Sequence, residues 1–302
     1  MDIIILSQLL LVILIIYIGS KLGGISMGIA GMFGTYVLVY WFELKPGDPP
    51  IDVMLIIVAV ICASSALQAS GGMDYLVGKA SKFLRKHPEQ ITYYGPLVCW
   101  VLCLVAGTAH TSYSMLPIIS EIARKSKVRP ERPLSVSVIA ASLGITGSPV
   151  SAATAAIIGT ELLGAKGVGM IDILIICIPA SLIAILVASF VQNHIGKELD
   201  DDPVYQERLK KGLIKDTATV DVLETMTPER RKRALWSVIA FLFAVFCIIL
   251  AGLVEALRPE AVTMTHTIEM VMFMAAGLIA IVGKIKVTEV SKAISSRQVW
   301  SL

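Results

Sequence analysis

Long apolar blocks separated by short polar segments dominate the chain. The runs Ile3–Gly19 and Ile51–Leu67 together contain a single charged residue, Asp52. A helix of about 17–25 apolar residues is long enough to cross the ~30 Å hydrocarbon core of a bilayer. The hydrophobic pattern therefore predicts an all-α polytopic membrane protein.

The same pattern places the individual elements. Membrane helices are expected over residues 3–19, 24–42, 53–70, 170–192, 234–254 and 267–283. An amphipathic helix over 74–86, capped by Asp74 and rich in Lys and Arg, is expected at the inner membrane surface. Residues 91–124 predict a helical hairpin, and residues 133–164 predict an interrupted helix.

Two polar breaks interrupt the apolar segments, at Gly107–Ser112 (GTAHTS) and at Thr146–Ser151 (TGSPVS). Irregular backbone at membrane depth is tolerated only where protein or water covers it. Paired breaks of this kind are typical of a carrier with its substrate site at the bilayer midplane. The arm after the first break spans about 13 residues, roughly 20 Å of helix, and is therefore short for a full crossing. We expect a re-entrant hairpin, although two full spans would give the same sidedness.

Composition agrees with a membrane location. Of 302 residues, 56% are apolar and 16% are charged, and the mean hydropathy is +0.78. Soluble domains usually contain about 25% charged residues. The five cysteines all lie in apolar segments without a CxxC pair, which favours small buried side chains over a disulfide or a metal site. The first apolar block lacks a basic n-region and a cleavage motif, which favours a retained helix over a signal peptide.

Charge placement predicts the orientation. With the N-terminus outside, 23 of the 26 Lys and Arg residues fall on the inner side, and only Lys45, Lys166 and Arg258 fall outside. This distribution follows the positive-inside rule. The domains expected are a transmembrane bundle over 1–192, a cytoplasmic linker over 193–233 and an incomplete second transmembrane repeat over 234–302.

The breaks also carry the candidate chemistry. A helix is expected to start after each break, near Thr111 and near Val150, with free N–H groups that attract an anion. The preceding arms end at Gly107 and Gly147, where exposed carbonyls suit a cation or a proton donor. The candidate substrate-binding residues are Gly107, Thr108, His110, Thr111, Ser112, Gly147, Ser148, Pro149 and Ser151.

Two of these residues have individual roles. Pro149 removes a backbone hydrogen bond and is expected to keep the second break open. His110 is the only ionisable residue at either break. It is a candidate donor to a substrate carboxylate or acceptor of a coupling proton, and a structural hydrogen-bonding role is equally compatible with its position.

Several stretches along the chain resemble the anaerobic C4-dicarboxylate transporters of the Dcu A/B group. The matching stretches are Lys45–Met54, Gln68–Tyr75, Leu84–Pro88, Gly107–Ile119, Arg129–Pro133, Ser148–Ser151 and Asp201–Leu209. The resemblance implies a secondary transporter in the bacterial inner membrane, with a periplasmic N-terminus. It would exchange fumarate, succinate, malate or aspartate, for example by fumarate/succinate antiport during anaerobic growth.

The resemblance extends to the wider ion-transporter superfamily, in which two inverted repeats each supply a hairpin and an interrupted helix. By that similarity both breaks belong to the first repeat. The Ser-Asn-Thr of sodium-coupled relatives is replaced here by Gly107-Thr108-Ala109, which argues against sodium coupling. A coupling proton is the other candidate, and the sequence does not decide between the two ions. Family members continue well beyond Leu302, so the chain is interpreted as the first two-thirds of a carrier that is not expected to transport alone.

Two other function classes are considered. An intramembrane hydrolase using Ser148 or Ser151 with His110 lacks a Gly-x-Ser-x-Gly elbow and an acidic residue beside the histidine. A non-transporting membrane partner of a dicarboxylate-sensing kinase would use the basic inner segments Lys79–Lys86 and Lys197–Arg233. Besides the lipid bilayer, a homo-oligomer remains open as a partner. No residue pattern indicates a metal, an organic cofactor or nucleic acid.

Overall fold

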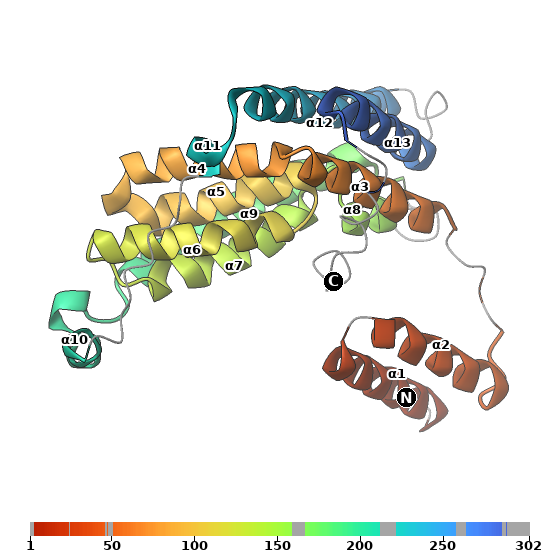
Figure 1. The fold of residues 1–302 in the computed structure, drawn as a ribbon. Helices are drawn as coiled ribbons and strands as arrows, with labels where there is room; N and C mark the ends of the chain where they lie inside the picture. Colours follow the sequence, from red (N-terminus) through yellow and green to blue (C-terminus); the bar gives the residue numbers. More distant parts are fainter. Residues whose placement is uncertain are drawn as a thin grey trace. The chain divides into compact units, whose positions relative to one another are not determined.

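Over the residues that the structure describes, the chain consists of helices joined by turns and loops (Figure 1). The structure is a computed structural model and describes residues 3–23, 25–45, 47, 51–158, 167–211, 222–257, 264–285 and 288. The helices are α1 (Ile3–Leu22), α2 (Ile25–Tyr40), α3 (Ile51–Ala69), α4 (Gly72–Lys86), α5 (Ile91–Ala106), α6 (His110–Lys125), α7 (Glu131–Thr146), α8 (Ala152–Ile158), α9 (Met170–Asn193), α10 (Pro203–Lys210), α11 (Val222–Thr225), α12 (Pro228–Leu257) and α13 (Met264–Gly283), with short 3-10 turns η1 (Pro88–Gln90) and η3 (Leu199–Asp201).

Six helices within the described ranges are long and apolar enough to cross a membrane. They are α1, α3, α5 with the preceding turn η1, α9, α12 and α13. Six apolar helices of 18 residues or more in the described residues have the length and composition of membrane-spanning segments. The prediction of a polytopic all-α membrane protein is therefore confirmed.

The chain divides into two compact units, one formed by residues 1–51 and 291–302 and the other by residues 52–290. In the first unit α1 and α2 pack against each other. Gly34 of α2 lies directly against the Ile15 side chain, where a larger residue would collide. Small residues that allow backbones to approach closely are characteristic of helix pairs in membranes.

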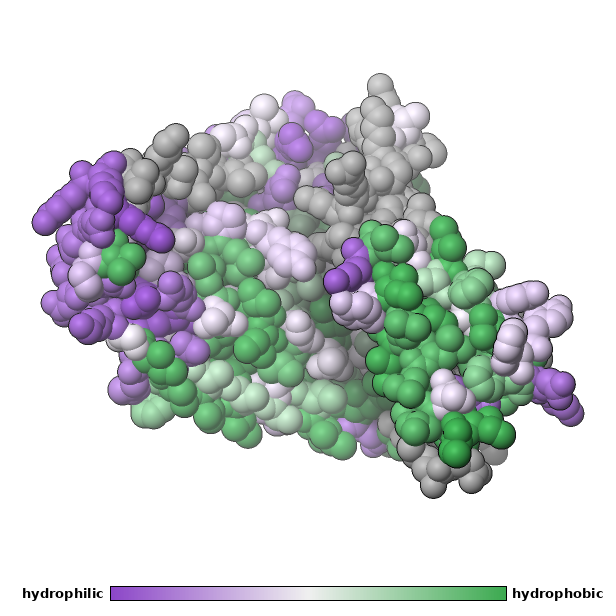
Figure 2. Space-filling view, turned by 90° about the horizontal axis from the view of Figure 1, so that it is seen from below, coloured by the Kyte–Doolittle hydropathy of each residue, from purple (hydrophilic) through white to green (hydrophobic). Residues whose placement is uncertain are grey.

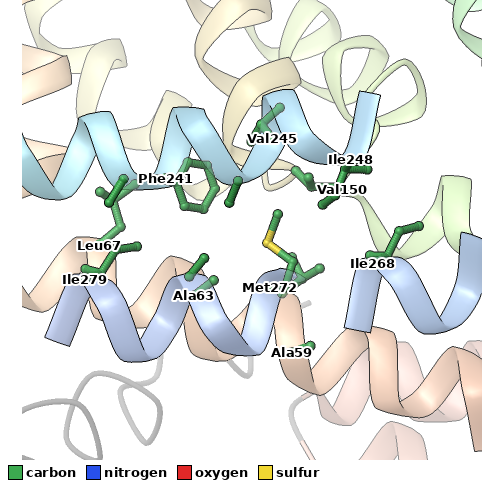
Figure 3. Close-up of a cluster of buried hydrophobic side chains, with 14 of the residues drawn as sticks. Ala59, Ala63, Leu67, Val150, Phe241, Val245, Ile248, Ile268, Met272 and Ile279 are labelled. Carbon is green, nitrogen blue, oxygen red and sulfur yellow. The ribbon is translucent and has the colours of Figure 1, made fainter. Parts of the chain in front are cut away.

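In the second unit α5, α6, α7 and α9 lie side by side, and α12 pairs with α13 (Figure 1). The closest approach is between α5 and α7. A Cβ atom on Gly144 of α7 would lie 2.7 Å from the carbonyl oxygen of Trp100. A separate apolar cluster joins α3, α12 and α13, where Leu67, Phe241 and Met272 pack together (Figure 3).

The surface of the second unit separates apolar from polar residues. Figure 2 shows hydrophilic residues gathered at the end that carries α10, with apolar residues along the helices beyond it. Large apolar side chains such as Ile175, Ile183 and Phe190 of α9 are exposed. Exposed apolar surface of this extent is expected where lipid surrounds the helices.

Ion pairs connect the polar ends of the helices. Arg132, buried at the start of α7, donates to the carbonyl oxygens of Ile195 at 2.9 Å and Gly196 at 2.8 Å, and to Glu198 at 2.7 Å. This contact fixes the end of α9 to the start of α7. The buried carboxylate of Glu121 similarly joins α6 to α4 through Arg85, at 3.1 Å.

Most predicted helices are present, with some differences at their ends. Helix α12 starts at Pro228 instead of residue 234, because the basic stretch 230–233 continues the helix. The prediction that Asp74 caps the amphipathic helix is wrong. The N-cap is Gly71, whose φ of +77° suits glycine, and Asp74 lies within the first turn of α4.

The hairpin and the interrupted helix are both present as helix–break–helix units. The predicted hairpin corresponds to α5 and α6, and the predicted interruption separates α7 from α8. Residues 159–166, at the end of the predicted interrupted helix, lie outside the described residues. The re-entrant path, the inverted repeat and the three predicted domain ranges stay predictions.

Candidate functional site at two helix breaks

The first break joins α5 to α6 through a left-handed glycine. Gly107 has a φ of +66°, and its N–H donates to the carbonyl oxygen of Cys103 at 2.9 Å. This is the usual way in which a glycine ends a helix. Helix α6 begins at His110, one residue earlier than expected, and the side chain of His110 lies outside what the structure describes.

The hydroxyls of the first break turn back onto its own backbone. Thr111 donates to the carbonyl oxygen of Thr108 at 3.0 Å, and Ser112 donates to that of Ala109 at 2.7 Å. Both side chains are buried. Thr111 and Ser112 are candidate substrate-binding residues, but in the structure their hydroxyl hydrogens are donated to the protein backbone. The Oγ1 atom of Thr111 also accepts from the Sγ atom of Cys103 at 4.0 Å.

The second break runs from Gly147 to Ser151, between α7 and α8. The Oγ atom of Ser148 accepts from the N–H of Val150 at 3.3 Å, which closes a tight turn around Pro149. The Oγ atom of Ser151 accepts from the N–H of Thr154 at 3.0 Å and therefore caps α8. Helix α8 starts at Ala152, two residues later than expected from the sequence.

The two breaks are in direct contact. A Cβ atom on Gly107 would lie 2.9 Å from the carbonyl oxygen of Val150 and 3.0 Å from its Cγ2 atom. Val150 is fully buried, and its side chain joins the apolar cluster beside Ile248 of α12 (Figure 3). The turn of one break therefore packs on the turn of the other, and α12 supports the second break from behind.

The structure places the predicted site residues in two groups. The buried group comprises Thr111, Ser112, Gly147, Ser148, Pro149 and Ser151. The partly buried group comprises Gly107 and Thr108. Sequence reasoning missed Thr154, which is buried and whose hydroxyl lies 2.9 Å from that of Ser151. Its position three residues after a capping serine is the signal that could have identified it.

Six apolar helices and two touching helix breaks define the class as a multi-pass membrane protein with interrupted helices. Comparison with protein families narrows this class. The family described as "Anaerobic c4-dicarboxylate membrane transporter" matches residues 4–299. The chain belongs to this family.

Individual relatives agree with the family assignment. The chain is 39% identical to the C4-dicarboxylate transporter DcuA of Wolinella succinogenes, over 95% of this chain and 65% of the relative. It is 37% identical to the anaerobic C4-dicarboxylate transporter DcuB of Escherichia coli O157:H7, over 94% of this chain and 66% of the relative. The chain thus spans just under two thirds of the length of these relatives. No solved structure matches it.

The comparisons bear on the alternative functions. The relatives are named as transporters, which argues against the intramembrane hydrolase. The partner of a dicarboxylate-sensing kinase stays a hypothesis.

Proposed function

We propose that this chain forms part of a secondary transporter that moves C4-dicarboxylates such as fumarate, succinate, malate and aspartate across the bacterial inner membrane. Family membership and the names of the relatives support the substrate class. The observation that carries the proposal is the contact between the two helix breaks, Gly107 against Val150, because it brings together the two segments that carry the candidate binding residues.

In this proposal the substrate carboxylates bind where the breaks meet. The first turn of α6 supplies the positive end of the helix dipole, which attracts a carboxylate. Ser148 and Ser151 fix the backbone of the second break through their bonds to Val150 and Thr154. The serines therefore act partly by positioning, and substrate binding would exchange some of their internal hydrogen bonds for bonds to a carboxylate.

Antiport follows from the same arrangement. A carrier that changes orientation only when a dicarboxylate neutralises the paired helix ends would exchange one dicarboxylate for another, such as fumarate for succinate. His110, at the first residue of α6, is the proposed site of a coupling proton, since imidazole changes charge near neutral pH. The N-terminus is proposed to be periplasmic from the distribution of Lys and Arg.

An exchange assay in proteoliposomes tests this function. The assay uses the full-length gene product. Vesicles loaded with succinate should take up labelled fumarate, and Ser148→Ala and Ser151→Ala should each raise the KM for fumarate by roughly tenfold, the effect of about 1.4 kcal/mol of binding energy.

The matched control is Ser142→Ala, because Ser142 lies exposed on α7 and bonds only to its own helix at the carbonyl oxygen of Val138. This variant should retain the KM of the unsubstituted protein. Loss of exchange to the same degree in all three serine variants would contradict a site at the second break. Uptake that does not depend on internal succinate would contradict antiport.

A further inference from the structure

A cluster of three metal-ligating side chains lies at the starts of α3 and α13. Asp52 is in the first turn of α3, and His266 and Glu269 lie one helical turn apart on α13. One ligand atom from each residue lies within 4.8 Å of the other two. We propose that Asp52, His266 and Glu269 bind a divalent transition-metal cation of the zinc class, independently of the substrate site.

The spacing of the ligand atoms fits a shared ion. The Nδ1 atom of His266 lies 3.5 Å from the Oε2 atom of Glu269. Two ligands at about 2.1 Å from a tetrahedral zinc ion lie about 3.4 Å apart. The two atoms therefore already have the separation that coordination requires. Asp52, an exposed residue, offers a carboxylate oxygen within 4.8 Å of both of these atoms.

The state of Glu269 is the second observation that indicates a ligand. Its side chain is 12% exposed, and its Oε1 atom is buried without a hydrogen-bond donor among the described residues. A buried carboxylate oxygen without a donor is costly. A divalent cation would compensate both carboxylates at once.

The ligand types select the class of ion. One imidazole with two carboxylates suits zinc and its neighbours in the first transition row, whereas magnesium and calcium favour sites made of oxygen atoms alone. Three protein ligands leave a fourth position of a tetrahedral ion for water.

Both helices that carry the ligands contribute to one apolar cluster. Ile56, one turn after Asp52, and Ile268, beside Glu269, are both fully buried in it. Figure 3 shows Ile268 in this cluster. Ligands on packed helices are placed more reproducibly than ligands on loops. A bound ion would cross-link the first turns of two helices that are far apart in the sequence. The charge pattern places the starts of both helices on the outer side of the membrane.

Titration of the purified protein with Co²⁺, followed by displacement with Zn²⁺, tests the site. The affinity tag is removed beforehand, because a histidine tag would bind the same ions. We expect one equivalent of Co²⁺ with visible absorption bands of a tetrahedral nitrogen and oxygen site. His266→Ala and Glu269→Gln should each weaken Co²⁺ binding by about tenfold or more.

The matched controls are His194→Ala and Glu255→Gln. His194 is an exposed histidine at the end of α9, and Glu255 is a carboxylate near the end of α12. Both variants should bind Co²⁺ as the unsubstituted protein does. Asp52→Asn, an exposed position, provides a ligand variant that is not expected to disturb folding.

The outcomes separate clearly. Weaker binding in the three ligand variants, with normal binding in the two controls and unchanged circular dichroism, supports the site. The absence of stoichiometric Co²⁺ binding to the unsubstituted protein would overturn it. Glu269→Gln and Asp52→Asn variants that bind Co²⁺ as tightly as the unsubstituted protein would also overturn it. Equal loss in His194→Ala would identify the binding as non-specific surface coordination and would overturn it too.

Discussion

At the scale of single residues, the contact between the two breaks depends on the absence of a side chain at Gly107. Its φ of +66° is unfavourable for other residues, and a Cβ atom would lie 2.9 Å from the backbone oxygen of Val150. Gly107→Ala is therefore expected to destabilise the native state by about 1–3 kcal/mol. The measurement is the free energy of unfolding in mixed detergent micelles titrated with a denaturing detergent.

The control for this substitution is Gly277→Ala. Gly277 lies within α13 with open space around it, so alanine should be neutral there or stabilise the helix by up to about 1 kcal/mol. Equal unfolding free energies for the two variants would show that the turn at Gly107 relaxes without cost.

The hydrogen bonds of the breaks illustrate what the sequence could predict about the site. The clusters of Gly, Ser, Thr and Pro between apolar runs located both breaks, because several such residues together favour a turn. A single proline does not end a helix here, since Pro96 lies inside α5 and Pro117 inside α6. The partners of the hydroxyls could not be predicted. From the sequence the hydroxyl of Thr111 could bond a ligand or the backbone, and only the turn geometry of the folded chain selects the carbonyl oxygen of Thr108.

At the scale of elements, α7 and α9 depend on one buried guanidinium. Arg132→Lys is expected to destabilise the protein by about 1.5–3 kcal/mol, because an ammonium group cannot reach Ile195, Gly196 and Glu198 in the fixed fork of arginine. Lys127→Ala removes an exposed pair with Asp200 and should leave stability unchanged. Thermal unfolding of both variants in the same detergent checks this, and equal midpoints would contradict the role of Arg132.

Helix α4 gives a pH-dependent prediction. Burial raises the pKa of Asp74, and the nearby Arg230 guanidinium lowers it in part. Since the folded pKa lies above the unfolded one, the favourable contribution of the protonated carboxyl is complete below about pH 3.9 and is lost as the pH rises through the folded pKa. Asp74→Asn should therefore be more stable than the unsubstituted protein at pH 7.

Unfolding measured between pH 4 and pH 7 checks the sign. The stability difference between Asp74→Asn and the unsubstituted protein should shrink as the pH falls. The exposed Asp201 on η3 serves as control, and Asp201→Asn should show no such trend. An Asp74→Asn variant less stable than the unsubstituted protein at pH 7 would mean that the Arg230 contact outweighs burial.

Helix positions were predictable from the sequence, whereas helix ends near the membrane surface were not. The apolar blocks identify the membrane segments, since lipid requires about 20 consecutive apolar residues. The start of α12 was missed because Arg230 and its neighbours have good helix propensity and extend the helix into the polar region. The cap of α4 was missed because a left-handed Gly71 and an Asp74 three residues later both signal a helix start.

At the scale of the whole molecule, the charge distribution predicts which ends of the helices face the cytoplasm. In a background without the five native cysteines, Lys45→Cys and Gly167→Cys should react with a membrane-impermeant maleimide added to intact cells. Lys211→Cys should react only after the cells are opened, because it lies in the basic segment after α9. All three positions are exposed at turns or helix ends, so accessibility reports the side of the membrane and not burial in the protein.

Labelling of Lys211→Cys in intact cells would reverse the predicted orientation. It would also move the starts of α3 and α13, with Asp52 and His266, to the cytoplasmic side, where the proposed cation site would meet the metal pool of the cytoplasm.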